Sequence, residues 1–441
     1  MQGRRIIQSV IICFFMLANA RSQQQLVTLQ DAIAATLRNN YDILLVKTDS
    51  AAAAIDKEYI YAGFLPTVNG IVSRTQNTST QKQVLVDHST RTGKDVQNIN
   101  LNAAVNLNWV LFDGLQMFAI RDRLNQQFDL EKINLKNQVV NSTAEVVNAY
   151  YIIVRQKQQL KAIEEQMSIN EERVKLADRK LSVGLGTKPE LLQAKVDLNA
   201  QKAIHLQQQT IMEQAKEELN QLTGMRLPAF YEVTDSIPIN DSYHIEDIQN
   251  NIEQTNLTIQ QYAKNVDISK TLLREAQGAR WPTISFGSGY TFSKTDTRNV
   301  INPYSTIFNR NTGFNFGFTA NVPILNYMNV NRSIKQARLN IDYNETSLSR
   351  QKNMINMSVR VGYNNYRYQL SALRLEEENI ELAKENVAIA LERFRLGVST
   401  YLELREAQKS LEDAYDRLIA ARYNTKLAET ELLRLKGELV R

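Results

Sequence analysis

Strict alternation of apolar and polar residues distinguishes one short segment of this chain. From Ile99 to Trp109 every second position is apolar, and four of the five positions between them are Asn. A period of two places one row of side chains on each face of a β-strand. The same reasoning predicts strands at about 67–79, 99–110, 283–295 and 312–322. Each covers about ten to thirteen residues, which is the length that a tilted strand needs to cross a bilayer.

Long helices with a heptad pattern make up most of the remaining chain. The segments 115–183 and 328–396 would each extend roughly 100 Å. Apolar residues recur in them every seven positions: Val139, Val146, Ile153, Leu160, Met167, Val174 and Leu181, then Val359, Tyr366, Leu373, Ile380, Val387 and Phe394. A second apolar series lies two residues along, about 200° around each helix: Ala162, Ile169, Leu176 and Val183, then Leu375, Leu382, Ile389 and Leu396. Each long helix therefore needs partners on two sides, as in a closed cylinder of helices.

The two halves of the chain repeat one pattern. DAIAATLRNNYDI from Asp31 pairs with DIQNNIEQTNLTI from Asp247, and LSVGLGTKPELLQA from Leu181 pairs with FRLGVSTYLELREA from Phe394. Each half reads as helix, strand, polar loop, strand, long helix, glycine turn and helix. The short helices are expected at about 31–63, 188–222, 247–279 and 400–436. We predict a first repeat over 21–224, an equatorial linker over 225–246 that adds a short strand, and a second repeat over 247–441.

The first twenty residues read as a secretory signal peptide. They combine two arginines, an apolar run and a small-x-small end, Ala18-Asn19-Ala20. The one cysteine, Cys13, lies in the apolar run, so the mature chain is expected to have no disulfide and no lipid anchor through Cys. The net charge of +5 is modest, and the basic residues are interleaved with acidic ones along helices. This pattern is typical of solvated helical faces and excludes nucleic acid as a partner.

No arrangement of residues predicts an enzyme. The three histidines, His88, His205 and His244, fall in a loop, a helix and the linker. The sequence has no zinc-protease, phosphate-loop or nucleophile-elbow motif. We therefore expect no catalytic residue, no cofactor and no metal site.

Four strands are too few to close a membrane barrel, since the smallest use about eight. Open strand edges in lipid would leave backbone groups unsatisfied, at several kcal/mol each. The strands must therefore close by oligomerisation. The alternative is a soluble sheet whose apolar face is covered by helices.

The repeated pattern resembles the TolC family of outer-membrane channel proteins. The resemblance rests on the TLQDAIAATLRNN opening, the FLPTV and RWPTI strand starts, the FDG and VPILN strand ends, and the VGLGT and LGVST turns. It covers essentially the whole mature chain. It implies a mainly α fold with a β-barrel contribution: a homotrimer whose twelve strands close one outer-membrane barrel on a long α-helical periplasmic tunnel, in a Gram-negative bacterium.

The same resemblance implies the exit duct of a tripartite efflux system. Such a duct passively conducts substrates from a periplasmic adaptor (membrane fusion) protein and an inner-membrane transporter of the RND or ABC type. Type I protein secretion uses the same kind of exit channel, so the substrate stays open. A periplasmic coiled-coil adaptor that forms no channel is an alternative of another class. Adaptors typically have one helical hairpin, whereas this chain has two hairpins and strands of bilayer length.

The resemblance also implies a periplasmic gate at the turns between long and short helices. Glu403 and Glu406 are one helical turn apart and match two acidic positions that line the closed entrance in the best-known members. Glu190 matches an acidic position in the first repeat. Rings of these carboxylates in a trimer would repel one another and favour cations.

The closed-state latch of the best-known members is not matched in this sequence. Phe394 and Ser399 occupy the positions of its tyrosine and arginine. Arg405 is a possible substitute, although it should point about 100° away from Glu406. The turn glycines are expected to allow the sharp turn, to cap the helices and to let adaptor helices approach: Gly184, Gly186 and Gly397.

The strands are predicted to face two environments. The apolar rows should face outer-membrane lipid, with Trp109 near an interface, and the Asn row should face a watery lumen. The lipid-facing set comprises Leu101, Val105, Leu107, Trp109, Phe314, Phe316 and Phe318. The junction between barrel and tunnel is expected at Pro66, Gly114, Pro282 and Pro323.

Overall fold

The computed structural model describes residues 25–228, 230–302, 304–324 and 327–439. The predicted signal peptide, residues 1–20, lies outside the described residues. The described chain forms two compact units, each drawing on both halves of the sequence. The first contains residues 25–49, 132–261 and 349–439, and the second contains residues 50–131 and 262–348.

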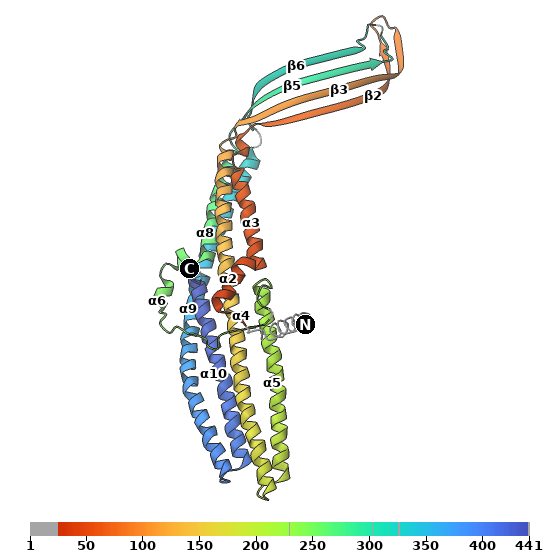
Figure 1. Ribbon diagram of the computed structural model, residues 1–441. Helices are drawn as coiled ribbons and strands as arrows, with labels where there is room; N and C mark the ends of the chain where they lie inside the picture. Colours follow the sequence, from red (N-terminus) through yellow and green to blue (C-terminus); the bar gives the residue numbers. More distant parts are fainter. Residues whose placement is uncertain (1–24, 229, 303, 325–326, 440–441) are drawn as a thin grey trace, which may run out of the picture. The chain divides into compact units, whose positions relative to one another are not determined.

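The elements follow the repeated order that the sequence predicts (Figure 1). The first half contains β1 Gln25–Leu26, α2 Leu29–Asn39, α3 Tyr41–Glu58, a 3-10 turn at Ala62–Phe64, β2 Thr67–Val84, β3 Thr90–Phe112, α4 Gln116–Ser182 and α5 Lys188–Leu222. The linker contributes β4 Tyr231–Glu232 and α6 Ile245–Gln249. The second half contains α7 Ile252–Thr255, α8 Leu257–Gly278, β5 Thr283–Arg298, β6 Phe308–Asn321, α9 Tyr327–Arg395 and α10 Tyr401–Lys436.

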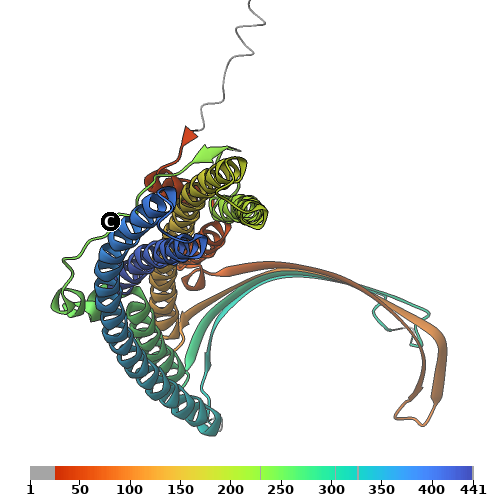
Figure 2. The same cartoon turned by 90° about the horizontal axis from the view of Figure 1, so that it is seen from below.

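A four-stranded antiparallel sheet of order β2-β3-β5-β6 belongs to the second unit. The strands share one curve when the sheet is seen from below (Figure 2). They are longer than the alternation predicts, because pairing continues through the polar segments as far as Val84 with Thr90 and Asp296 with Phe308. Backbone pairing tolerates polar side chains where neither face has to be buried, so the apolar pattern underestimates strand length.

The register separates two chemically different faces across all four strands. Val105 pairs with Gly70 and Tyr290, and Tyr290 pairs with Phe314. On the other face Asn106 pairs with Gly289, which pairs with Asn315. A Cβ on Gly289 would lie 2.8 Å and 2.9 Å from the side-chain oxygens of these two asparagines. One face of the sheet is therefore rich in aromatic and aliphatic side chains, and the other in Asn, Ser, Thr and Gly.

The heptad pattern is confirmed in the α9–α10 hairpin. All six members of the first α9 series, from Val359 to Phe394, are buried, each with no more than 6% of its surface exposed. Leu373, Ile380 and Val387 pack with Ala407, Leu411, Ala414 and Leu418 of α10. Fully burying one such side chain contributes about 1.5–3 kcal/mol. The helical hairpin is thus held by the seam that the sequence predicts.

A second core joins α4 to the linker. Val146, Tyr150 and Ile153 are at most 1% exposed and cluster with α2, α5, Tyr231 and Val233. The linker strand β4 pairs in parallel with β1. Lys157 of α4 forms ion pairs of 2.9 Å with Glu232 and 2.7 Å with Asp235. The linker therefore contains a short strand, which packs against α4.

The prediction of a continuous helix over 31–63 is wrong. The chain breaks at Asn40, whose side-chain oxygen accepts hydrogen bonds from the backbone N–H groups of Asp42 and Ile43 and so caps α3. The Asn40 amide donates to the carbonyl of Leu222, near the end of α5. Asn256 does the same in the second repeat, donating to the carbonyl of Leu435. In both repeats the asparagine at the break thus connects the helix that follows it to the C-terminal end of another short helix, α5 in the first repeat and α10 in the second.

Candidate functional site at the helical turns

The α4–α5 and α9–α10 turns have the same backbone construction. In the first turn Gly184 has φ of +78°, its N–H donates to the carbonyl of Leu181, and the N–H of Leu185 donates to the carbonyl of Lys180. In the second turn Gly397 has φ of +75°, and the N–H groups of residues 397 and 398 repeat both bonds. This is a Schellman cap, which favours glycine because other residues are strained at positive φ.

The third turn glycine has a different role. A Cβ on Gly186 would lie 2.9 Å from the backbone nitrogen of Leu181 and from Cβ of Lys180, whereas nothing lies within 4 Å of such an atom on Gly184 or Gly397. Gly186 therefore allows close packing within its own turn, and Gly184 and Gly397 leave open surface at theirs.

Two of the three predicted gate carboxylates occupy the first turn of a short helix. Thr187 caps α5 and accepts a hydrogen bond from the N–H of Glu190, while the Glu190 carboxylate accepts one of 3.2 Å from the N–H of Thr187. Thr400 caps α10 and accepts from the N–H of Glu403. Acidic residues at these positions are also favoured by the helix dipole.

Glu403 and Glu406 lie exposed on the surface of the single chain. Glu403 is 55% exposed in its side chain, and its nearest cation is Arg393, with 3.9 Å between Nη2 and Oε2. Glu406 is exposed too, and its carboxylate forms no hydrogen bond or ion pair with another described residue. Within the single chain neither carboxylate forms a close ion pair, so both can interact with another molecule that contacts this turn.

Phe394 and Ser399 differ in their contacts, and Phe394 joins the end of α9 to α4. Phe394 is 6% exposed, and Lys180 of α4 lies 3.9 Å from its ring centroid. The Lys180 ammonium also donates a 2.8 Å hydrogen bond to the carbonyl of Phe394. The hydroxyl of Ser399 is buried and has no hydrogen-bond partner among the described residues. A cation–π contact and a hydrogen bond to the backbone therefore join α4 to the end of α9 at Phe394.

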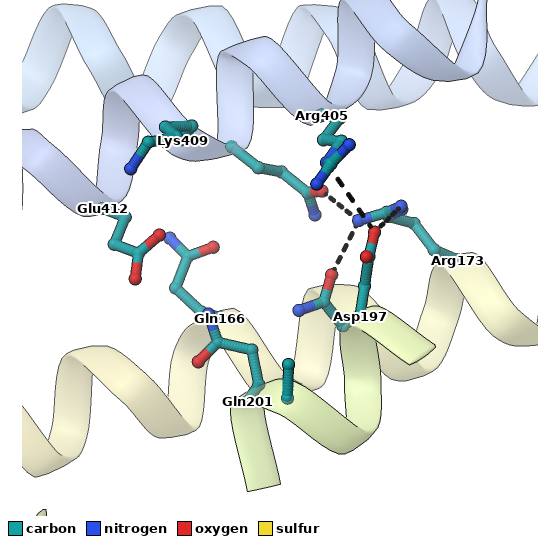
Figure 3. Close-up of a pocket in the computed structure, with 10 residues that line it drawn as sticks. Gln166, Arg173, Asp197, Gln201, Arg405, Lys409 and Glu412 are labelled. Atoms are coloured by element: carbon teal, nitrogen blue, oxygen red, sulfur yellow. Dashed lines mark hydrogen bonds and ion pairs between the residues drawn. The ribbon is translucent and has the colours of Figure 1, made fainter. Parts of the chain in front are cut away.

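A network of polar contacts surrounds Arg173, which lies about three helical turns before the α4–α5 turn (Figure 3). This side chain is 3% exposed and donates to Asn170 at 2.8 Å, to Gln408 of α10 at 2.6 Å and to Asp197 of α5 at 3.0 Å. The guanidinium lies 4.6 Å from the ring centroid of Tyr401. One buried cation thereby joins three helices.

Asp197 is the anionic centre of this network. Tyr401 donates a 2.5 Å hydrogen bond to it, Gln193 donates one of 2.9 Å, and Arg405 approaches to 3.9 Å. Burial by itself would raise the pKa of Asp197, but the hydrogen bonds from Tyr401, Gln193 and Arg173 outweigh it, so the pKa is lowered. Arg405 therefore does pair with a carboxylate, on a neighbouring helix of the same protomer.

The sequence interpretation missed Arg173, Asp197 and Tyr401. A signal for Arg173 exists: buried residues follow α4 at spacings of three and four, Ile163, Gln166, Asn170, Arg173 and Ala177. Polar residues occupy the middle of that seam. The seam adjoins a cavity of about 180 Å³ lined mainly by polar and charged side chains, Gln201, Lys409 and Glu412 among them. Such a lining is unlike the mostly apolar pockets that bind small molecules.

The predicted junction residues flank the strands. Pro66 and Pro282 each precede a strand by one residue, Pro323 follows β6, and Gly114 follows β3. Gly114 has φ of +75°, and a Cβ on it would lie 2.1 Å from the carbonyl oxygen of Gly278. A Cβ on Gly278 would likewise meet the Gly114 oxygen at 2.8 Å. The sequence interpretation missed this second glycine, which permits a close approach of two backbones.

The predicted lipid-facing residues share one face of the sheet. Phe314, Phe316 and Phe318 are 67–72% exposed, Val105 is 53% and Trp109 is 40% exposed, while Leu101 and Leu107 are half-buried. The indole N–H of Trp109 donates a 2.8 Å hydrogen bond to the carbonyl of Phe64. An exposed apolar face of this extent marks an interaction surface.

Metal-binding and membrane-spanning helical features were also searched for in the described residues. They contain no group of three or more His, Cys, Asp or Glu side chains placed to hold a metal ion. None of their helices has the length and apolar character to cross a membrane.

Comparison with known proteins identifies relatives of this chain. The chain is 23% identical over 344 residues to the outer membrane protein TolC of Salmonella enteritidis, covering 75% of this chain and 68% of that protein. It is 22% identical to TolC of Escherichia coli, covering 67% of this chain and 59% of that one. The structure of the Campylobacter jejuni CmeC outer membrane channel superimposes with a TM-score of 0.74 at 17% identity, covering 93% and 85% of the two chains. A model of the outer membrane efflux protein family matches residues 32–225 and 249–438, and the chain therefore belongs to this family of outer-membrane proteins.

Proposed function

We propose that three copies of this chain form a passive exit duct of a tripartite efflux system. The duct receives substrates from a periplasmic adaptor and an inner-membrane transporter and releases them outside the cell. It performs no catalysis and needs no cofactor. Family membership supports an efflux role, and the surfaces left uncovered in the single chain support the assembly.

The second apolar series of α9 is the observation that carries this proposal. Leu375, Leu382, Ile389 and Leu396 are 53–75% exposed, although the first series of the same helix is fully buried. Exposed apolar residues continue on α5, where Leu192, Val196 and Leu206 are 52–64% exposed. Stripes of this length on two helices are suited to pack against further copies, which buries them in a closed ring.

The sheet gives a second reason for assembly. Its edge strands β2 and β6, of 18 and 14 residues, each have one side without a strand partner among the described residues. In lipid such edges would cost several kcal/mol per unpaired backbone group. Three copies would supply twelve strands, join every edge, turn the apolar face to lipid and enclose the Asn-rich face around water.

The turns form the periplasmic gate in this proposal. Glu403 and Glu406 of each copy would contribute two acidic rings, with Glu190 nearby, and the open surface at Gly184 and Gly397 would receive adaptor helices. Carboxylates gathered around a narrow opening attract cations and repel anions. Because Phe394 and Ser399 replace the usual latch pair, the cation–π contact of Lys180 and the Arg173 network are the restraints available to the closed state.

The proposal is tested with the purified full chain in detergent and in planar bilayers. We expect the mass of a trimer and discrete, cation-selective conductance. The double variant Glu403→Gln, Glu406→Gln should still form trimers, and its cation permeability should fall toward that of anions. The matched control is Glu412→Gln, Asp413→Gln on the same helix, which should keep the selectivity. A soluble monomer without conductance would refute the duct, and unchanged selectivity in the first variant would refute the gate.

A further inference from the structure

A row of basic residues crosses the sheet on its apolar face. The register pairs Arg74 of β2 with Leu101 of β3, Leu101 with Lys294 of β5, and Lys294 with Arg310 of β6. The adjacent row on the same face, toward the strand ends that join the helices, is Val72, Ala103, Phe292 and Thr312. The basic row therefore directly borders the apolar rows and faces the same side of the sheet.

The spacing of this row is comparable with the height of the apolar band of an outer-membrane protein. Trp109 and Leu101 lie eight residues apart on β3, which corresponds to about 26 Å along the strand and, for a strand tilted by about 35–45°, to about 20 Å along the membrane normal. Between their rows the face holds chiefly aromatic and aliphatic side chains, Val105, Tyr290 and Phe314 among them. An outward-facing apolar band is about 25 Å tall in outer-membrane proteins. Trp109 thus borders one end of the band, and the basic row borders the other.

Two of the three cations have no carboxylate partner among the described residues. Lys294 pairs with Asp296 at 2.8 Å. Arg310 instead lies 5.3 Å from the ring centroid of Phe292, and Arg74 is exposed on the edge strand. Residues 74–98 and 294–312 together contain seven Lys and Arg against three Asp. The end of the sheet away from the helices therefore presents a positive surface beside an apolar one.

We propose that this row binds the phosphate groups of a phosphorylated glycolipid, of the lipid A type, in the outer leaflet of the membrane. This inference rests on the proposed function, because it takes the apolar face to lie in lipid. Acyl chains pack on the apolar rows, and headgroup phosphates accept hydrogen bonds from Arg74 and Arg310. A guanidinium suits this task because its N–H groups can bind two phosphate oxygens at once. The apolar rows and the basic row are both needed to select a lipid over a free anion.

The test is binding of bisphosphorylated lipid A to the purified full chain in nonionic detergent, followed by native mass spectrometry. Each basic residue near a charged membrane surface contributes roughly a factor of five to binding. The variant Arg74→Gln, Arg310→Gln should therefore bind about 30-fold more weakly. The matched control Lys82→Gln, Arg91→Gln also removes two charges, both from the part of the β2–β3 hairpin beyond the row, and should stay within about twofold of the unmodified chain, since its charges lie outside the contact.

Two further measurements separate the sources of phosphate and the two proposals. The unmodified chain should bind dephosphorylated lipid A about as weakly as the Arg74→Gln, Arg310→Gln variant binds lipid A. Millimolar inorganic pyrophosphate should not displace lipid A from the unmodified chain. Equal binding of the dephosphorylated lipid, displacement by pyrophosphate, or equal losses in both variants would overturn this inference. Trimer mass and conductance are measured on the same preparations. Their failure in the unmodified chain would count against the duct, whereas failure of lipid binding alone would leave the duct intact.

Discussion

At the scale of single residues, the buried Arg173 is the feature that departs most from the apolar pattern. A buried cation is costly unless carboxylate and amide groups surround it, because desolvation is only partly offset by one ion pair. Here Asp197, Asn170 and Gln408 supply those groups from three helices. The network therefore fixes one relative placement of α4, α5 and α10. An apolar seam would be less specific, because apolar contacts are not directional.

Replacing Arg173 with Met should loosen the start of α10. The change leaves Asp197 with fewer donors and removes the contact to Gln408, so we expect a local loss of about 3 kcal/mol. The measurement is amide hydrogen exchange over residues 401–411, in which protection should fall while protection of the sheet is unchanged. Lys409→Met removes an exposed cation beside the same cavity and should change protection by less than about 0.5 kcal/mol. Equal protection in both variants would show that the network does not hold α10.

At the scale of elements, alternation in β3 proved a reliable guide to faces and a poor guide to ends. The residues from Ile99 to Trp109 do alternate between two faces, because side-chain direction in a strand follows the backbone alone. The ends depend on which other strands are present to pair with. Residues 90–98 look like a loop by composition, yet residues 90–93 and 96–98 pair with β2, on either side of an irregularity at residues 94 and 95.

A charge on the apolar face of β3 should impair membrane assembly far more than a charge on the polar face. Val105 lies midway along the apolar band, where a lysine costs about 2–4 kcal/mol in lipid. Asn106, one residue further, belongs to the Asn-rich face. We expect Val105→Lys to reduce sharply the folded trimer recovered from the outer-membrane fraction, and Asn106→Lys to have little effect. If both lysines are tolerated alike, the assignment of the two faces is wrong.

At the scale of the whole molecule, the single chain presents apolar stripes that its own fold does not cover. A helix with two opposite apolar series is stable only if both are packed. The first α9 series packs on α10, and the second is exposed in the single chain. In the proposed trimer, assembly would extend folding, with the same heptad chemistry used within and between chains.

Introducing a charge into the uncovered stripe should separate the copies without unfolding the hairpin. Leu382 is 65% exposed in the single chain, so Leu382→Glu should leave the α9–α10 core intact. Burying an unpaired carboxylate at each seam of a trimer would cost about 2 kcal/mol or more. We expect monomers by analytical ultracentrifugation with unchanged helical circular dichroism, while Leu382→Met should remain a trimer. A trimer of Leu382→Glu with normal stability would place the seam elsewhere.

The sequence alone determined the repeated order of elements, the faces of the strands and the buried seam of α9. These follow from local rules, since side-chain direction and heptad spacing depend only on neighbouring residues. The tertiary structure decided the helix breaks at Asn40 and Asn256, the extension of the strands into polar segments, the close approach of Gly114 and Gly278, and the partners of Arg173. Each depends on a group distant in sequence, such as the carbonyl of Leu222 or the carboxylate of Asp197. The sequence pattern does not specify the distance between groups that are far apart along the chain, so these contacts are known only from the folded structure.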